Sequence, residues 1–219
     1  MIAANKIIIA DDHPLFRDAL RQALNKAFGD IEILTCGAFS SLQRKLEEHS
    51  NTDLILLDLH MPGAVGFSAL RYLGLRCPEI PVAIVSAHEE HEIMMQTLEH
   101  GASGFIAKSS NLSDIIDAVR RILLGDVVLP KGVDMQYPDA TTNTPFSEQL
   151  ETLTPKQFRV LMMLVDGKIN REIADELCVT EATIKAHLTE IFKKLNVSNR
   201  TQAATLASQH LEVGEQHLI

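Results

Sequence analysis

The sequence predicts an α/β domain built on a doubly wound, five-stranded parallel sheet, followed by a small all-α domain of four helices. Two observations predict this order. Residues 6–125 alternate short apolar runs with longer helical patterns, whereas strand signals stop from residue 153 onward. The 219 residues also fit two domains of ~100–150 residues better than one. We therefore predict a first domain at 1–125, a linker at 126–151 and a second domain at 152–219.

Five short runs in the first domain are the expected strands. Apolar residues dominate them without the regular polar alternation of a half-exposed strand, which is typical of strands buried on both faces of a parallel sheet. Helical patterns fill the intervals, and five strand–helix units in sequence predict helices on both faces. The expected strands are 6–10, 31–36, 54–57, 82–85 and 104–107, and the expected helices are about 14–28, 40–49, 67–75, 90–100 and 112–124.

The linker is rich in proline, glycine and small polar residues, and four helices are expected after it. Thr154 and Gln157 match a capping box at the start of the first helix. Asn170 and Thr180 are expected to cap the second and third helices, and the fourth is expected to begin at Ser198.

Composition argues against several classes of protein. The longest apolar run covers six residues, 160–165, whereas a membrane span needs ~18–20. The first residues lack the basic start and long apolar core of a signal peptide. Cys36, Cys77 and Cys178 form no CxxC pair, so neither a disulfide framework nor a zinc site is supported, and a cytoplasmic location is expected.

The formal net charge of −9 is unevenly distributed. Residues 1–125 carry 11 basic and 16 acidic side chains and the linker carries one and five, whereas residues 152–219 carry eight of each. Because binding to nucleic acid depends on neutralising phosphates, an acidic chain as a whole argues against it. The last third is far less acidic than the rest, so the overall charge does not exclude DNA binding by the helical domain.

Polar side chains follow four of the expected strands. Asp11 and Asp12 follow the first, Asp58 the third, Ser86 the fourth and Lys108 the fifth. Because the carboxyl ends of parallel strands meet at one edge of the sheet, we expect these side chains to converge. A single residue of this kind is usually a turn, capping or solvated residue. Their occurrence together at one edge is what indicates a functional site.

The expected cluster has the groups needed for phosphoryl transfer. Crowded carboxylates repel one another unless a cation joins them, and oxygen ligands of this kind suit Mg²⁺. An Asp carboxylate beside Mg²⁺ and an ammonium can attack a phosphoryl donor and form an aspartyl phosphate. Lys108 and Mg²⁺ would neutralise the phosphoryl oxygens, and the Ser86 hydroxyl would donate to one of them.

Four segments resemble the receiver domain of two-component response regulators. They are Asp11-Asp12, 57–63 (Leu-Asp-Leu-His-Met-Pro-Gly), Ser86-Ala87 and 104–108 (Gly-Phe-Ile-Ala-Lys). The resemblance implies that Asp58 takes a phosphoryl group from a phosphohistidine on a sensor histidine kinase, with Lys108 completing the site. It also implies that Ser86 and Phe105 are the hydroxyl and aromatic residues of the phosphorylation switch.

The same resemblance assigns a cation site. It implies that Asp12, Asp58 and the backbone carbonyl of His60 bind Mg²⁺, and that Asp11 takes part through water. His60 and His88, which the family pattern does not fix, follow Asp58 and Ser86 by two residues. Either they are exposed loop histidines without a role, or they set the lifetime of the aspartyl phosphate. The sequence leaves both readings open.

The helix expected at 180–195 has an apolar stripe and an opposite polar face at 100° per residue. The stripe consists of Ile184, Leu188, Ile191 and Leu195. The opposite face carries Lys185, Ala186, Thr189 and Lys193. Small and basic residues there suit a helix that lies in the major groove of DNA. Periodicity alone is equally consistent with an ordinary amphipathic helix whose lysines are solvated.

Residues 153–155, 170–174, 183–187 and 194–197, with Arg200, resemble the LuxR-type helix-turn-helix DNA-binding domain over about 152–210. The resemblance implies that double-stranded promoter DNA is a partner and that the last helix, about 199–210, forms a homodimer on activation. It implies base-edge contacts from Lys185, Ala186 and Thr189, and phosphate contacts from Thr180, Thr183 and Lys194. The family's Arg-Glu pair reads Lys156-Gln157 here, so one charge pair is expected to be missing.

These features are typical of a response regulator of the NarL/FixJ type, which is a phosphorylation-switched transcriptional regulator and not an enzyme. Two alternatives come from other classes. A signalling adaptor would use the helical domain for protein contacts, but it would not need the polar face described above. A phosphatase-like enzyme would use Asp58 and Asp12 on small substrates, but the sequence offers no substrate-binding domain.

Overall fold

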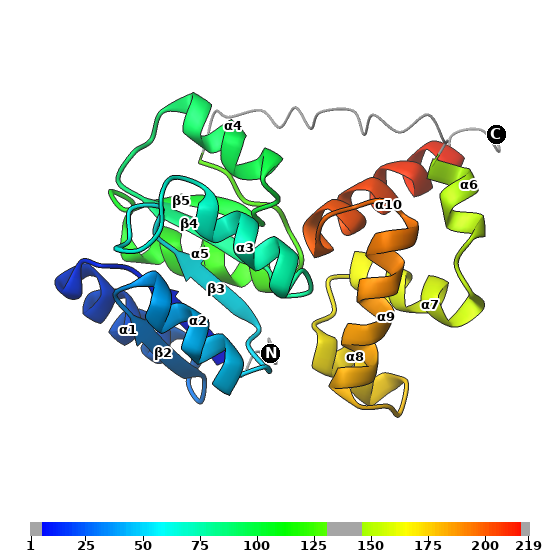
Figure 1. The fold of residues 1–219 in the computed structure, drawn as a ribbon, viewed down its shortest axis with the longest axis horizontal. Coiled ribbons are helices and arrows are strands. Elements are labelled where there is room, and N and C mark those ends of the chain that lie inside the picture. Colours follow the sequence, from blue (N-terminus) through cyan, green and yellow to red (C-terminus); the bar gives the residue numbers. More distant parts are fainter. Residues whose placement is uncertain (1–5, 131–145, 216–219) are drawn as a thin grey trace.

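The computed structural model describes residues 6–130 and 146–215, which form two domains (Figure 1). The first is an α/β domain whose parallel sheet has the strand order β2-β1-β3-β4-β5. The predicted five-stranded, doubly wound sheet is confirmed. Its strands are β1 (Lys6–Ala10), β2 (Glu32–Cys36), β3 (Leu54–Leu57), β4 (Val82–Ser86) and β5 (Gly104–Ala107); its helices are α1 (Pro14–Phe28), α2 (Phe39–Glu48), α3 (Ser68–Arg76), α4 (His91–Glu99) and α5 (Leu112–Leu123).

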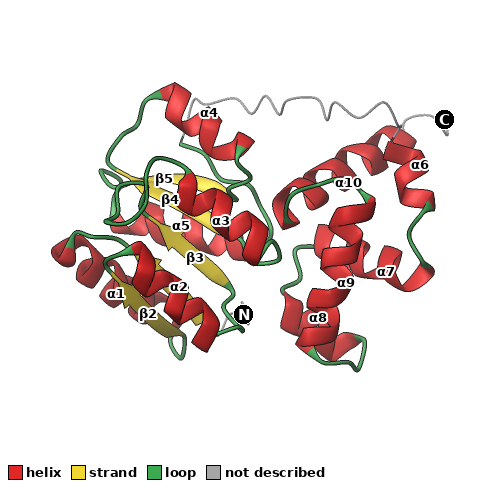
Figure 2. Cartoon of the chain, viewed as in Figure 1, coloured by secondary structure: helices red, strands yellow, loops and turns green. Residues whose placement is uncertain are grey.

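Helices cover both faces of this sheet (Figure 2). Successive side chains of a strand point to opposite faces. Ile8 and Ile55 therefore pack with α2, α3 and α4, whereas Ile7 and Leu56 pack with α1 and α5. Full burial of each such side chain contributes about 1.5–3 kcal/mol. Burial on both faces explains why these runs of sequence lack polar alternation.

Every element of this domain begins and ends within one residue of its predicted limits. Asn111 precedes α5 at the capping position, but its side chain makes no capping hydrogen bond. Its Nδ2 instead donates to Oδ2 of Asp114 (3.4 Å).

The second domain contains the four helices predicted after residue 153 and one that was not predicted. Helix α6 falls within the segment interpreted as a linker, of which residues 131–145 lie outside the described residues. Its Phe146 and Leu150 are four residues apart, so they share one side of the helix and pack against the core of this domain. The helices are α6 (Phe146–Glu151), α7 (Pro155–Val165), α8 (Asn170–Glu176), α9 (Glu181–Lys194) and α10 (Arg200–Glu215).

Two of the predicted caps in the helical domain are confirmed. The Thr154 Oγ1 accepts from the Gln157 N–H (3.2 Å), and the Gln157 side chain accepts from the Thr154 N–H (3.0 Å). The Thr180 Oγ1 accepts from the Thr183 N–H (3.2 Å) at the start of α9. These bonds satisfy amide donors that the first helical turn leaves free.

The other two helix starts differ from the prediction. Asn170 is the first residue of α8 rather than its cap, and its Oδ1 accepts from Nη1 of Arg200 (3.2 Å). Helix α10 begins at Arg200 rather than at Ser198, and Oδ1 of Asn199 accepts from the Gln202 N–H (3.0 Å) at its start. No helix within 6–130 or 146–215 is long and apolar enough to cross a membrane.

The helical domain contacts the sheet domain at the edge where the strands begin (Figure 1). The first turn of α10 takes part, because the Arg200 N–H donates to the Pro78 carbonyl (3.0 Å). The buried hydroxyls of Ser103 and Thr201 lie 2.6 Å apart. The Arg200 side chain is buried, which lowers its pKa to about 10, although nearby carboxylates oppose this.

A close approach of backbones also joins the two domains. A Cβ atom added to Gly167 would lie 1.7 Å from the carbonyl oxygen of Leu124, and one added to Gly125 would lie 2.8 Å from Cα of Gly167. Both glycines have positive φ angles, 77° and 94°. The docked arrangement therefore requires glycine at position 167.

Candidate functional site

The carboxyl ends of β1 and β3 bring three carboxylates together. Asp11 directly follows β1 and Asp58 directly follows β3, where the Asp58 N–H donates to the Ala10 carbonyl (2.8 Å). Parallel pairing of these two strands aligns their ends. Potential ligand atoms of Asp11, Asp12, His13 and Asp58 all lie within 4.8 Å of one another, and we call these four residues the acidic cluster.

Lys108 follows β5 and completes the predicted convergence. Its Nζ lies 2.7 Å from Oδ2 of Asp58 and 2.8 Å from Oδ2 of Asp11. Burial by itself lowers the pKa of Lys108, but the contacts with Asp11 and Asp58 outweigh burial, so the pKa is raised. The ammonium therefore stays charged and balances two buried carboxylates.

His13 belongs to the acidic cluster, although it was not predicted from the sequence as a site residue. Its Nδ1 lies 2.6 Å from Oδ1 of Asp12, 3.3 Å from Oδ1 of Asp11 and 3.2 Å from Nζ of Lys108. The signal in the sequence is its position directly after Asp12, at the amino-terminal cap of α1. A residue directly after Asp12 lies at the same sheet edge as Asp11 and Asp12.

The donor set of the acidic cluster fits Mg²⁺. Two buried oxygens, Oδ2 of Asp11 and Oδ1 of Asp12, accept no hydrogen bond of regular geometry. Their close neighbours are Lys108 Nζ at 2.8 Å and His13 Nδ1 at 2.6 Å. Buried carboxylate oxygens require a cation or a donor, and Mg²⁺ prefers oxygen ligands of this kind.

The two predicted switch residues lie in neighbouring strands. Ser86 ends β4 and is fully buried, and its Oγ accepts from the His88 N–H (3.1 Å). Phe105 in β5 is 1% exposed, and it is the register partner of Ile84 in β4. Ser86 therefore stands at the same sheet edge as Asp58, while the Phe105 ring lies in the core.

His60 and His88 form a ring contact beside this edge. The ring centroids are 4.7 Å apart, with an angle of 42° between the planes. Both residues are exposed, and the His60 N–H donates to Oδ1 of Asp58 (3.0 Å). The two histidines that follow Asp58 and Ser86 are thus one pair rather than two separate loop residues.

Helix α9 presents the predicted polar face. The predicted stripe is confirmed, since Ile184, Leu188, Ile191 and Leu195 are all buried. Ala186 and Thr189 are exposed, and Thr180 and Thr183 lie at the start of the helix. Helices α8 and α9 are joined by a short turn in which Cys178 has a φ of 53°. The two helices, with this turn, form the predicted helix-turn-helix.

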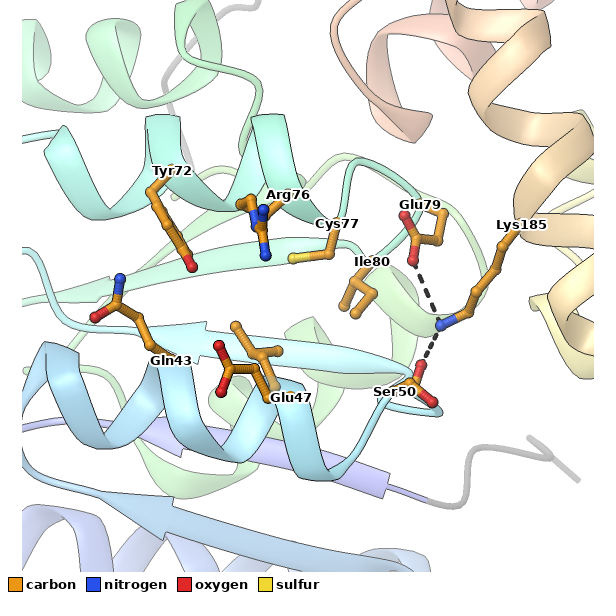
Figure 3. Close-up of a pocket in the computed structure, with 10 residues that line it drawn as sticks. Gln43, Glu47, Ser50, Tyr72, Arg76, Cys77, Glu79, Ile80 and Lys185 are labelled. Carbon is orange, nitrogen blue, oxygen red and sulfur yellow. Dashed lines mark hydrogen bonds and ion pairs between the residues drawn. The ribbon is translucent and has the colours of Figure 1, made fainter.

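Lys185 reaches across to the sheet domain (Figure 3). Its Nζ donates to the carbonyl oxygen of Ser50 and lies 3.4 Å from Oε1 of Glu79. Ser50 follows α2 and Glu79 precedes β4, so both belong to the sheet edge opposite Asp58. We call Lys185, Ser50 and Glu79 the docking contact. The sequence predicts Lys185 on the outer face of the helix but indicates neither Ser50 nor Glu79 as its partner.

Lys194 lies on the other side of α9, since nine residues correspond to about two and a half helical turns. Its Nζ donates to the Thr152 carbonyl (2.8 Å) and to Oε1 of Gln157 (2.8 Å). Gln157 stands where the family has the glutamate of its Arg-Glu pair, and here it accepts a hydrogen bond from Lys194 instead of forming an ion pair. The structure does not bring Lys194 to the same face as Lys185 and Thr189.

Two family models match this chain. "Response regulator receiver domain" matches residues 7–120, and "Bacterial regulatory proteins, luxR family" matches residues 151–207. The Glycerol metabolism activator of Pseudomonas putida is 41% identical over 90% of this chain and 92% of its own length. The nitrate/nitrite response regulator protein NarL of Escherichia coli (strain K12) is 29% identical over 93% of this chain and 94% of its own length.

Solved structures also resemble this chain. A structure of the Salmonella typhimurium RcsB response regulator has a TM-score of 0.55 at 22% identity and covers 94% of this chain and 98% of its own. A structure of two RcsB dimers bound to two parallel DNAs gives the same values. At this identity the likeness concerns the fold. With the family models and the relatives, it shows that the chain belongs to the response regulators, as a two-component transcriptional regulator with a receiver domain and a LuxR-type DNA-binding domain.

Proposed function

We propose that Asp58 is the phosphoacceptor and that its phosphorylation controls binding of α9 to promoter DNA. The observation that carries the proposal is the 2.7 Å contact of Lys108 Nζ with Oδ2 of Asp58 inside the acidic cluster. An Asp58 oxygen attacks the phosphorus of a phosphohistidine on a sensor histidine kinase, the P–N bond breaks, and the imidazole leaves with a proton. Lys108 then neutralises one phosphoryl oxygen, and the Ser86 hydroxyl donates to another.

Asp12, Asp58 and the backbone carbonyl of His60 hold Mg²⁺ in this proposal, and Asp11 takes part through a water molecule. The bound ion supplies positive charge to the phosphoryl oxygens. The buried Asp11 and Asp12 oxygens without regular hydrogen bonds support this assignment. Phe105 responds to the Ser86 hydroxyl as the second switch residue.

For DNA, we assign base-edge contacts to Lys185, Ala186 and Thr189 and phosphate contacts to Thr180 and Thr183. Lys194 is a weaker candidate for a phosphate contact, because two of its three N–H groups are donated within the domain. Helix α10 pairs with its copy in a second chain to form a homodimer on DNA. A partner that is promoter DNA supports a cytoplasmic location for this activity.

The docking contact supports phosphorylation dependence. It occupies the Lys185 ammonium, and Thr189 lines a cleft of about 450 Å³ together with Arg71 and Pro78 of the receiver domain. A helix can enter a DNA groove only when its outer face is free. The domains must therefore separate before DNA binds. Phosphorylation shifts the equilibrium between the docked and the separated arrangement toward the separated one.

We retain domain limits of 1–125 and 152–219, with 126–151 as the connecting segment. The receiver match ends at residue 120 and the luxR match begins at residue 151, which supports these limits. Packing of α6 on the helical core indicates that the end of the connecting segment moves with the second domain.

The test is selection of genomic DNA fragments by purified full-length protein with and without acetyl phosphate, alongside Asp58→Asn. We expect specific fragments to be enriched only by the phosphorylated wild type. Equal enrichment by all three samples would contradict the phosphorylation dependence. No enrichment by any sample would favour a signalling adaptor whose helical domain binds proteins.

A further inference from the structure

His13 contributes the one nitrogen ligand atom to the acidic cluster. The other members supply carboxylate oxygens, and His13 Nδ1 lies 2.6 Å from Oδ1 of Asp12 and 3.7 Å from Oδ2 of Asp58. The ring is 64% exposed, so a ligand can enter from solvent beside it. Asp11, with its side chain 2% exposed, holds its Oδ2 at the same place, 2.8 Å from Lys108 Nζ and without a hydrogen bond of regular geometry.

The local backbone holds His13 in this position. Its N–H donates to Oδ1 of Asp11 (2.8 Å), which closes a turn immediately after β1. Its φ and ψ of −85° and 103° are extended, and Pro14 begins α1 directly after it. The restricted proline φ fixes the start of the helix. Nδ1 therefore faces the carboxylates without rearrangement of the chain.

The chemistry of the two kinds of ligand differs. Carboxylate and carbonyl oxygens suit Mg²⁺, whereas an imidazole nitrogen suits first-row transition ions, which bind nitrogen more tightly than Mg²⁺ does. We propose that Nδ1 of His13 is a direct ligand of the divalent ion, so that the site also binds first-row transition ions with a nitrogen in the coordination shell; Mn²⁺, which accepts oxygen ligands and imidazole, is the probe. This rests on the proposed cation site and adds a ligand to it.

The test uses full-length protein loaded with Mn²⁺ and electron spin-echo envelope modulation, which detects a nitrogen nucleus bound to the ion. We expect ¹⁴N modulation in the wild type and in His91→Ala, which removes an exposed histidine of α4. We expect no ¹⁴N modulation in His13→Ala. Titration calorimetry should show a Kd for Mn²⁺ at least about tenfold weaker in His13→Ala, with the Kd for Mg²⁺ changed about twofold or less.

A second variant distinguishes loss of the nitrogen ligand from loss of folding. His13→Asn keeps a good helix-capping residue and an oxygen ligand, so it should bind Mg²⁺ normally and still lose the ¹⁴N modulation. Mn²⁺ binding without ¹⁴N modulation in the wild type, or modulation that persists in both His13 variants, would overturn the proposal while leaving the cation site intact. Failure of the wild type to bind either ion would overturn the cation site as well.

Discussion

Lys108 connects three strands of the receiver domain at the scale of single residues. It follows β5 and contacts residues that follow β1 and β3. Its side chain is 11% exposed, whereas those of Asp11 and Asp58 are 2% and 3% exposed. Removing one partner of a buried ion pair costs about 3–5 kcal/mol, because the remaining charge is left without compensation. Lys108 therefore stabilises this edge of the sheet by compensating the two buried carboxylates.

The first prediction concerns the phosphoacceptor. Asp58→Asn should abolish labelling by acetyl phosphate, because an amide oxygen is a poor nucleophile. Mass spectrometry of the intact protein measures the added phosphoryl group. Asp117→Asn, a matched change at an exposed position of α5, should label like the wild type. Labelling that persists in Asp58→Asn would move the acceptor to Asp11 or Asp12.

The second prediction concerns the three thiols. Burial raises the pKa of Cys36 to about 11 and that of Cys77 to about 12, whereas Cys178 is exposed. Since the thiolate is the reactive form, iodoacetamide at pH 8 should modify only Cys178 in the folded protein and all three thiols in denaturant. Peptide mapping identifies the modified residues. Rapid native modification of Cys77 would show that this part of the domain opens.

The raised pKa values of Cys36 and Cys77 also predict how the stability of the protein changes with pH. A thiol whose folded pKa lies above its unfolded value of 9.0 contributes stability that is complete below pH 9. This contribution is lost as the pH rises toward 11 and 12. The free energy of unfolding should therefore fall above pH 9, and Cys36→Ala with Cys77→Ala should reduce the slope of that fall.

At the scale of elements, α9 packs into its domain with one face and presents the opposite face to solvent. The buried stripe fixes the helix in the domain, and the polar face is left for a partner. The stripe follows from the 3.6-residue period, which is a local property of the sequence. Asn170 shows where local reasoning failed. It is a good capping residue, but it accepts a bond from Arg200, which lies 30 residues away in another helix.

The third prediction concerns this polar face. Lys185→Ala in the phosphorylated protein should weaken specific DNA binding by ~1–3 kcal/mol and relax selectivity if Lys185 reads a base edge. Fluorescence anisotropy over a salt series measures both effects. Lys156→Ala, an exposed change on α7, is the matched control. An equal loss on all sequences, with a shallower salt slope, would make Lys185 a phosphate contact, and no loss would favour the adaptor.

At the scale of the whole molecule, the two functional regions lie at opposite edges of one sheet. The acidic cluster is at the carboxyl ends of the strands, and the docked helical domain is at their amino ends (Figure 1). The docking contact, the Ser103–Thr201 hydroxyl pair and the Gly167 approach all lie on this second edge. In the proposed function, a phosphoryl group at Asp58 would therefore act on the helical domain through the sheet and not by direct contact.

The fourth prediction concerns the docked arrangement. Glu79→Gln removes the negative charge beside Lys185 but leaves Lys185 itself available to DNA. A partly exposed ion pair contributes up to about 1 kcal/mol, so the unphosphorylated variant should bind DNA up to about fivefold more tightly than the unphosphorylated wild type. Glu48→Gln, an exposed change on α2, should have no effect. Small-angle scattering should show an increased radius of gyration for Glu79→Gln only.

The helices and strands of the receiver domain and most residues of its site could be predicted from local sequence patterns. Strands buried on both faces leave continuous apolar runs, and the residues that follow them lie at one edge because the strands are parallel. Asp11, Asp58 and Lys108 could therefore be predicted without coordinates. His13 could not, because an exposed histidine after a strand carries no periodic signal, and only the closed turn shows that it faces the carboxylates.

The contacts between the two domains could not be predicted from the sequence. Lys185 and Ser50 are 135 residues apart, and Ser103 and Thr201 are 98 residues apart. Periodicity, capping and charge patterns report the surroundings of a residue along its own helix or strand, but no local pattern encodes which surface of a second domain will pack against it. The polar face of α9 therefore follows from the local sequence, whereas the contact of its Lys185 with Ser50 and Glu79 of the receiver domain follows from the packing of the two domains.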